Sequence, residues 1–143
     1  MSEKRVPVFF YGLYMDFAVL RRYGDIPEVW EAAKLPGYDL RVASWGYLVP
    51  SDRDSVYGTL VGVTHEELER LYGPSNDFLS LKYVPEPVLV ETAGGRWRAA
   101  LCYVSADDPE GPVNVDYVDK LVALTEKLGF PRWYTERLAG YRA

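Results

Sequence analysis

The 143-residue sequence has one cysteine and one histidine, and this scarcity excludes several kinds of site. The single cysteine, Cys102, has no internal disulfide partner, so a reducing, cytoplasmic setting is expected. Zinc or iron sites built from cysteine and histidine are excluded, and no metal is expected. A catalytic triad would have to use His65, which stands in the first turn of a predicted helix and is expected on the surface.

Long apolar runs and an excess of positive charge are also missing. No run approaches the roughly 20 apolar residues that span a bilayer, and no signal peptide is visible, so no membrane association is expected. Sixteen Lys and Arg against 21 Asp and Glu give a net charge of −5. Because affinity for phosphate depends on clustered positive charge, nucleic acid is not an expected partner. Phosphate-binding glycine loops of the Walker or dinucleotide type are absent as well.

Aromatic residues, in contrast, are abundant: they make up 15% of the chain, with 12 Tyr and four Trp. Buried tyrosines and tryptophans need hydrogen-bond partners. The sequence therefore indicates either a small β-rich core with amphipathic rims or a ligand pocket into which phenol hydroxyls point. Length and an ordinary hydrophobic content of 48% predict one globular domain over residues 1–143.

Hydrophobic periodicity and turn residues predict a mixture of strands and helices. Strands are predicted at 6–11, 38–42, 55–63, 84–90 and 97–104. Helices are predicted at 15–23, 65–71, 116–128 and 131–138, with a further helical turn within 26–34. Thr64 and Glu67 form a capping-box pattern, and Pro85 and Pro87 either place their strand at an edge or interrupt it near its start. Because hairpins and long crossovers alternate, we expect an α+β fold whose mixed, curved sheet closes toward a small barrel.

The strongest local signal is the turn after the first strand, where Tyr11-Gly12-Leu13-Tyr14 leads into a helix. A strand that ends in a glycine turn and opens a helix leaves backbone N–H groups without internal partners, which suits a carboxylate. Most turns of this kind bind nothing, so the turn alone does not establish a site.

Further motifs follow this turn in a characteristic order. They are Leu35-Pro36-Gly37-Tyr38, Leu48-Val49-Pro50-Ser51, Val56-Tyr57-Gly58-Thr59-Leu60, the capped helix from Thr64 to Leu71, Tyr83, Ala100-Leu101-Cys102-Tyr103, and Leu128-Gly129-Phe130-Pro131 with Arg132-Trp133-Tyr134. In order and spacing, this set resembles the gamma-glutamylcyclotransferase-like (AIG2-like) family over residues 6–138.

The resemblance implies a small mixed-sheet barrel with a cavity at one end. In the family, a Tyr-Gly-Ser-Asn-type turn holds a γ-glutamyl group through backbone amides. Its counterpart here is Tyr11, Gly12, Leu13 and Tyr14, with Leu13 and Tyr14 in place of Ser and Asn. Backbone donors survive that exchange, whereas the side-chain hydrogen bonds do not. Tyr83 matches a tyrosine of the family's pocket.

The resemblance also implies an intramolecular reaction without metal or cofactor. The substrate's α-amine attacks its own γ-carbonyl, 5-oxoproline forms and the amine partner leaves. A glutamate serves as base and then as acid. Its place falls on Ser75 or Asn76, and neither is a carboxylate.

Two hypotheses follow from this departure. In the first, the loop is shifted and Asp77 is the base, with Glu86 as the alternative. In the second, the chain keeps a pocket for a γ-glutamyl or related small amide but has lost the chemistry, since fold and function separate readily.

A hypothesis of another class is a protein-interaction module. Trp30, Trp45 and Trp97, together with the Pro-interrupted edge strand, would suit an interface. This hypothesis predicts a filled pocket and an outer apolar patch, whereas the enzyme hypothesis predicts an open cavity with Asp77 or Glu86 near Gly12. The sequence does not indicate which amide is bound, nor the oligomeric state.

Overall fold

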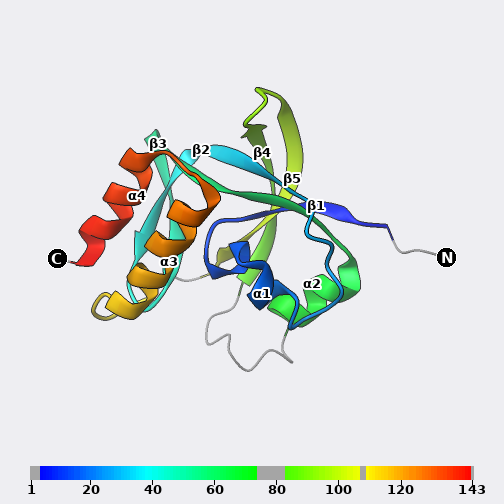
Figure 1. Ribbon diagram of the computed structural model, residues 1–143, viewed down its shortest axis with the longest axis horizontal. Helices are drawn as coiled ribbons and strands as arrows, with labels where there is room; N and C mark the ends of the chain where they lie inside the picture. Colours follow the sequence, from blue (N-terminus) through cyan, green and yellow to red (C-terminus); the bar gives the residue numbers. More distant parts are fainter. Residues whose placement is uncertain (1–3, 74–82, 107–108, 143) are drawn as a thin grey trace.

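Five strands form a closed barrel in the order β1-β3-β2-β4-β5 (Figure 1). The computed structural model describes residues 4–73, 83–106 and 109–142. The strands are β1 (Val6–Phe10), β2 (Trp30–Val42), β3 (Gly46–Val63), β4 (Tyr83–Thr92) and β5 (Trp97–Ser105). β1 pairs in parallel with β5, and the other pairings are antiparallel. The predicted α+β barrel with a mixed sheet is therefore confirmed.

Short helices follow β1 and β3, and two helices end the chain, as the sequence predicts. The helical elements are η1 (Leu13–Met15), α1 (Phe17–Leu20), α2 (His65–Tyr72), α3 (Val115–Leu128), α4 (Arg132–Ala139) and η2 (Gly140–Arg142). α3 and α4 lie together on one side of the barrel, and α1 and α2 lie on another (Figure 1). The capping box of α2 is present: the Glu67 N–H donates to Thr64 Oγ1 at 3.1 Å, and the Thr64 N–H donates to Glu67 Oε1 at 2.9 Å.

The helical turn predicted within 26–34 is wrong, because β2 already begins at Trp30. Residues Trp30 to Leu35 pair with β3, and the burial of Ala33 and Leu35 follows the alternation of a strand. Pairing with a distant strand outweighs the local pattern here. The helix predicted at 15–23 is also shorter than expected. Asp16 adopts extended backbone angles and separates η1 from the four-residue α1, and its side chain caps α1 by accepting a hydrogen bond from the Ala18 N–H.

The core explains why β1 is apolar on both faces: Phe9 and Phe10 are both buried. Phe9 lies against Gly58 of β3. A Cβ added at Gly58 would lie 2.2 Å from the carbonyl oxygen of Phe10 and 2.6 Å from the Phe9 ring. The glycine in this strand thus permits a close approach of β1 to β3.

Two further features of the strands concern Cys102 and the prolines of β4. Cys102 is fully buried on β5, and burial raises the pKa of its thiol to about 12, so the thiol is inert. β4 pairs with β5 throughout but with β2 only at Glu91 and Thr92. Pro85 and Pro87 therefore lie where one side of β4 has no partner strand among the described residues.

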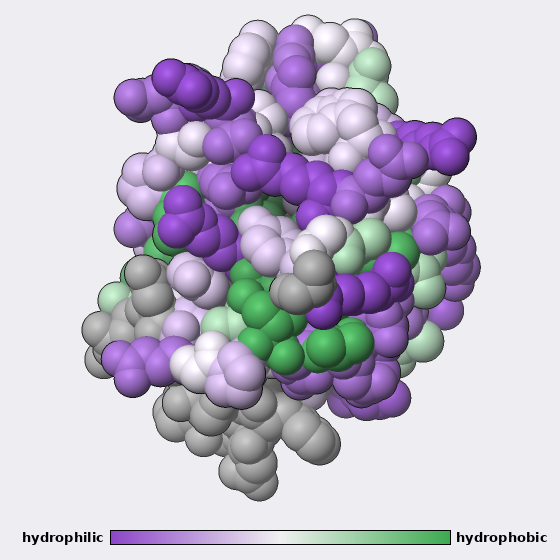
Figure 2. All heavy atoms as spheres, turned by 90° about the vertical axis from the view of Figure 1, so that its left-hand side faces the viewer, coloured by the Kyte–Doolittle hydropathy of each residue, from purple (hydrophilic) through white to green (hydrophobic). Residues whose placement is uncertain are grey.

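The described helices are all too short or too polar to cross a membrane. Hydrophilic side chains cover most of the face on which α3 and α4 lie, with a smaller hydrophobic area near its centre (Figure 2). His65 is exposed at the start of α2, as predicted.

Candidate functional site

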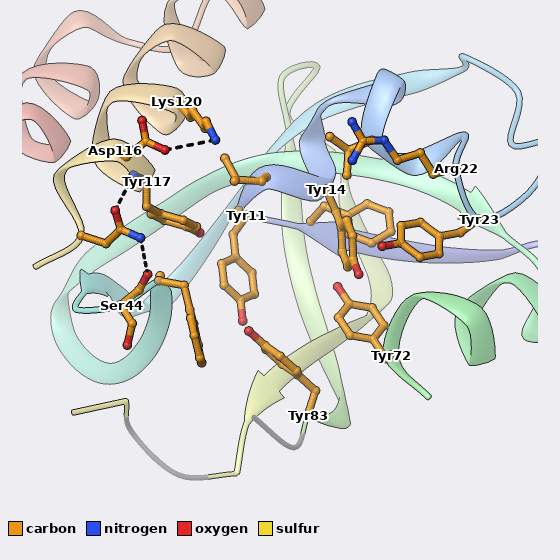
Figure 3. Close-up of a pocket in the computed structure, with 17 residues that line it drawn as sticks. Tyr11, Tyr14, Arg22, Tyr23, Ser44, Tyr72, Tyr83, Asp116, Tyr117 and Lys120 are labelled. Carbon is orange, nitrogen blue, oxygen red and sulfur yellow. Dashed lines mark hydrogen bonds and ion pairs between the residues drawn. The ribbon is translucent and has the colours of Figure 1, made fainter. Parts of the chain in front are cut away.

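A cavity of about 380 Å³ lies where the turn after β1 meets the β2–β3 connection, the end of α2, the start of β4 and the start of α3 (Figure 3). Its walls include Tyr11, Gly12, Leu13, Tyr14 and Tyr83. The structure therefore brings together, in one cavity, the five positions that the family resemblance implies for ligand binding. Its volume is in the range of small-molecule sites.

Two tyrosine hydroxyls anchor the turn that borders the cavity. The Tyr11 hydroxyl donates to the carbonyl oxygen of Tyr103 on β5 at 2.7 Å, and the Tyr14 hydroxyl donates to that of Leu71 on α2 at 2.8 Å. Within the turn, the Met15 N–H donates to the Gly12 carbonyl at 3.0 Å. The backbone of the turn is thus held in place from both sides, and Tyr14 gives it a connection to α2.

Position 12 requires glycine because a side chain would not fit there. Its backbone does not require glycine, since its φ is −116°, outside the left-handed region. A Cβ at Gly12 would lie 2.9 Å from the hydroxyl oxygen of Tyr117, and so would a Cβ at Gly46. The Tyr117 hydroxyl on α3 therefore lies close to Gly12, which precedes η1, and to Gly46, the first residue of β3. Because neither glycine has a side chain, the Tyr117 ring can pack into the cavity wall.

Asn114 fixes the start of α3 that carries Tyr117. Its side chain accepts a hydrogen bond from the Tyr117 N–H at 3.2 Å and caps the helix. Its side-chain amide donates to the Ser44 carbonyl at 3.3 Å, and its backbone N–H donates to the Ala43 carbonyl at 2.7 Å. The β2–β3 connection and α3 are thereby joined beside the cavity (Figure 3).

A row of tyrosine rings forms another wall. The centroid of Tyr72 lies 5.3 Å from Tyr14 and 5.4 Å from Tyr83, and Tyr72 stacks on Tyr103 at 4.0 Å. Tyr23 extends the row, with its centroid 5.8 Å from Tyr14. Ring pairs at such distances are favourable beyond their burial, so this wall is rigid.

Four of the tyrosines that line the cavity, Tyr11, Tyr72, Tyr83 and Tyr117, are neutral hydrogen-bonding groups at ordinary pH. Burial raises the pKa of Tyr11 and Tyr72 well above that of a free phenol, and it raises the pKa of Tyr83 to about 12. Burial also raises the pKa of Tyr117, despite a hydrogen bond with the Gly46 backbone. Since none of these phenols ionises near pH 7, they do not supply a general base.

Charge at the cavity comes from three exposed side chains: Arg22, Asp116 and Lys120. Lys120 pairs with Asp116 at 3.1 Å (Figure 3). Asp116 is the one carboxylate among the described residues that line the cavity, and its side chain is 77% exposed. Apart from this exposed carboxylate, the described walls provide cations and neutral hydrogen-bonding groups.

The two carboxylates predicted as bases have different positions. Asp77 lies outside the described residues. Glu86 lies on β4 opposite Cys102 and does not line the cavity. Tyr72 and Tyr83, however, both line the cavity. Asp77 falls between these two wall residues in the sequence.

Trp45 lines the cavity instead of the outer surface on which the interaction hypothesis placed it. Its indole Nε1 is buried without a hydrogen-bond partner in the described structure. Trp30 and Trp97 are exposed, at 37% and 56%. The interaction hypothesis predicts a filled pocket, whereas the described residues leave an open cavity beside Gly12.

The sequence prediction of the site did not include several wall residues, among them Arg22, Trp45, Tyr72, Tyr117 and Lys120. None belongs to a local motif of the binding turn. They converge through the packing of the segment after α1, the end of α2, the start of α3 and the β2–β3 connection, and the high content of tyrosine and tryptophan indicated only that aromatic rings could line a pocket.

The sequence matches a family model described as "Gamma-glutamyl cyclotransferase, AIG2-like" over residues 8–119. This range includes the turn at Gly12, the capped helix α2, Tyr83 and the start of α3. None of the curated proteins matches the sequence.

Solved structures resemble the fold. One titled "Gamma-glutamyl cyclotransferase" has a TM-score of 0.79 at 19% identity and covers 94% of this chain and 86% of its own. An uncharacterized protein from Homo sapiens has a TM-score of 0.75 at 20% identity, covering 95% and 87%. A yeast gamma-glutamyl cyclotransferase specific to glutathione has a TM-score of 0.66 at 12% identity, covering 97% and 96%. At these identities the likeness establishes the fold alone.

Proposed function

Because the chain belongs to the gamma-glutamyl cyclotransferase, AIG2-like family, we propose that its cavity binds a γ-glutamyl compound or a related small amide. One observation carries the proposal: Tyr11, Gly12, Leu13, Tyr14 and Tyr83 border one cavity of about 380 Å³. The backbone amides of the turn at Gly12 hold the glutamyl group. Residues Leu13 and Tyr14 do not interfere with this role, since the amides belong to the backbone.

The chemistry of the walls supports an acceptor-rich ligand. The phenols of Tyr83 and Tyr117 are protonated at neutral pH, because burial raises the pKa of both. A γ-glutamyl amide offers a carboxylate and an amide carbonyl as acceptors. Neutral donors suit both, and the ring wall accommodates the methylene groups of the glutamyl chain.

Calorimetric titration tests the binding proposal with two linkage isomers. γ-Glutamylalanine and α-glutamylalanine have the same composition and the same charges, but only the first has the proposed linkage. We expect the γ isomer to bind more tightly. A Tyr83→Phe variant, which keeps the ring and loses the hydroxyl, is expected to bind it up to about tenfold more weakly. Equal affinity for the two isomers would contradict the proposal.

A second candidate function is cyclisation of the bound γ-glutamyl group to 5-oxoproline. The position of Tyr72 and Tyr83 favours it, because both ends of the sequence interval that holds Asp77 are at the cavity. In this proposal Asp77 is the base, and Glu86 is the alternative. The carboxylate takes a proton from the α-ammonium, and the amine attacks the γ-carbonyl. The carboxylic acid so formed protonates the leaving nitrogen as the amide C–N bond breaks. The second proton that the α-nitrogen loses on becoming the lactam N–H leaves on the released amine as its ammonium group, so the proposed step needs no metal or cofactor.

A mass-spectrometric assay for 5-oxoproline tests this second function on γ-glutamyl dipeptides and γ-glutamylamines. We expect Asp77→Asn to lower turnover at least about 100-fold, because a neutral amide cannot accept the proton. Glu86→Gln should leave turnover unchanged. If both variants retain turnover, the base lies elsewhere. Binding without turnover would identify the chain as a binding protein on a cyclotransferase fold.

A cytoplasmic location remains a prediction from the single cysteine.

A further inference from the structure

Arg22 is the cation at the cavity that the proposed function leaves without a role. It follows α1 and lines the cavity, and its side chain is exposed. The structure gives it no ion pair with any described residue. Its neighbour Arg21, in contrast, reaches Glu28 at 3.8 Å, and Lys120 is paired with Asp116 at 3.1 Å. Arg22 is therefore the cavity's unpaired positive charge within the described part of the chain.

The order of side chains along the cavity places Arg22 away from Tyr11 and Tyr117, near the Tyr14 end of the binding turn (Figure 3). Tyr117 lies beside Gly12, and Tyr14 and Tyr72 follow, with centroids 5.3 Å apart. Tyr23 comes next, 5.8 Å from Tyr14, and directly precedes Arg22 in the sequence. Figure 3 shows the same order, with Tyr11 and Tyr117 toward one end and Tyr23 and Arg22 toward the other.

A ligand held at Gly12 would therefore extend its amine partner along the tyrosine row toward Arg22. Resting on the proposed function, we propose that Arg22 selects γ-glutamyl compounds whose amine partner carries a carboxylate. The substrate class is then γ-glutamyl amino acids or peptides, and simple γ-glutamylamines are disfavoured. A guanidinium presents paired donors that match a carboxylate.

Two ligands that differ by one carboxylate test this inference. γ-Glutamylphenylalanine and γ-glutamylphenethylamine share the glutamyl group and the phenyl ring, and only the first has the second carboxylate. We expect the protein to bind the first about fivefold more tightly in calorimetric titrations, the size typical of an exposed charge pair. The preference should shrink as salt is added, since salt screens exposed charges. Mass spectrometry after each titration establishes that the ligand is intact.

Arg22→Gln and Arg21→Gln are the matched variants, because they remove the same charge from adjacent positions. We expect Arg22→Gln to abolish the preference and Arg21→Gln to keep it. Equal weakening of both ligands by Arg22→Gln would overturn the inference, since Arg22 would then contact the carboxylate that both ligands share. Equal binding of both ligands to the unmodified protein would also overturn it, while leaving the proposed function intact. If neither ligand binds, both proposals fail.

Discussion

At the scale of single residues, the close approach of Gly12 and Tyr117 leaves no room for a side chain at position 12. A methyl group at position 12 would lie 2.9 Å from the Tyr117 hydroxyl oxygen, inside normal contact distance. We expect Gly12→Ala to lower the free energy of unfolding by about 1–3 kcal/mol, because the ring or the turn must shift. Urea denaturation without ligand measures this change. Adding Tyr117→Phe to Gly12→Ala removes the hydroxyl and should restore part of the loss.

Gly140→Ala is the control for this prediction. Gly140 has φ −60°, and a Cβ there meets nothing within 4 Å. Alanine at that position should leave stability unchanged or raise it slightly. A Gly12→Ala variant as stable as Gly140→Ala would show that the turn adapts freely to a side chain.

The same scale limits what the sequence can predict of the site. Gly12 and Tyr83 were identifiable because they belong to motifs with family counterparts. Tyr117 was not, since its role depends on an approach to Gly12 from a helix that is about 100 residues away in the sequence. Likewise, the absence of an ion pair between Arg22 and any described residue depends on which carboxylates the fold brings near it, and a sequence pattern does not contain that information.

At the scale of elements, the start of α2 depends on Glu67, which is buried with 6% of its surface exposed. Burial tends to raise the pKa of this carboxyl, but hydrogen bonds from the Thr64 backbone and from Arg5 outweigh burial, and the pKa is lowered. Arg5 donates to Glu67 at 2.8 Å and thereby connects the start of β1 to α2. A lowered pKa in the folded state means that the unfolded chain binds the proton more tightly.

The contribution of Glu67 to stability is therefore complete above the ordinary glutamate pKa of about 4.3 and is lost as the pH falls through the lowered value. We expect Glu67→Gln to be less stable than the unmodified protein at neutral pH and to lose less stability on acidification. Urea midpoints at about pH 7 and pH 3.5 measure both effects. Glu69→Gln, which changes an exposed glutamate of the same helix, is the control. Parallel pH profiles for Glu67→Gln and the unmodified protein would disprove the linkage.

Local signals predicted elements well where the stabilising contacts are local. The capping box of α2 depends on residues three apart and was identified correctly. The segment 26–34 was misassigned because its conformation depends on β3, with Trp30 paired to Val61. Strand pairing over 31 residues of sequence leaves little local trace.

At the scale of the whole molecule, closure of the barrel depends on how closely β1 approaches its neighbours. β1 is registered with β5 at two residue pairs, Val8 with Leu101 and Phe9 with Cys102, and with β3 along its full length. Gly58 of β3 permits this approach, because a Cβ there would lie 2.2 Å from the Phe10 carbonyl oxygen. The obstacle is backbone, which no rotation of a side chain relieves.

We therefore expect Gly58→Ala to destabilise the protein by at least about 3 kcal/mol, a large part of the 5–15 kcal/mol that typically separates folded from unfolded domains. Gly62→Ala in the same strand is the matched control, because its Cβ would lie 3.4 Å from the nearest atom, an ordinary contact. Alanine at position 62 should be neutral or stabilising by up to about 1 kcal/mol. Urea denaturation of both variants distinguishes the two effects. Similar midpoints for the two variants would mean that β1 can move away from β3 without opening the barrel. Because the turn at Gly12 directly follows β1, loss of closure at Gly58 should also abolish ligand binding in the cavity.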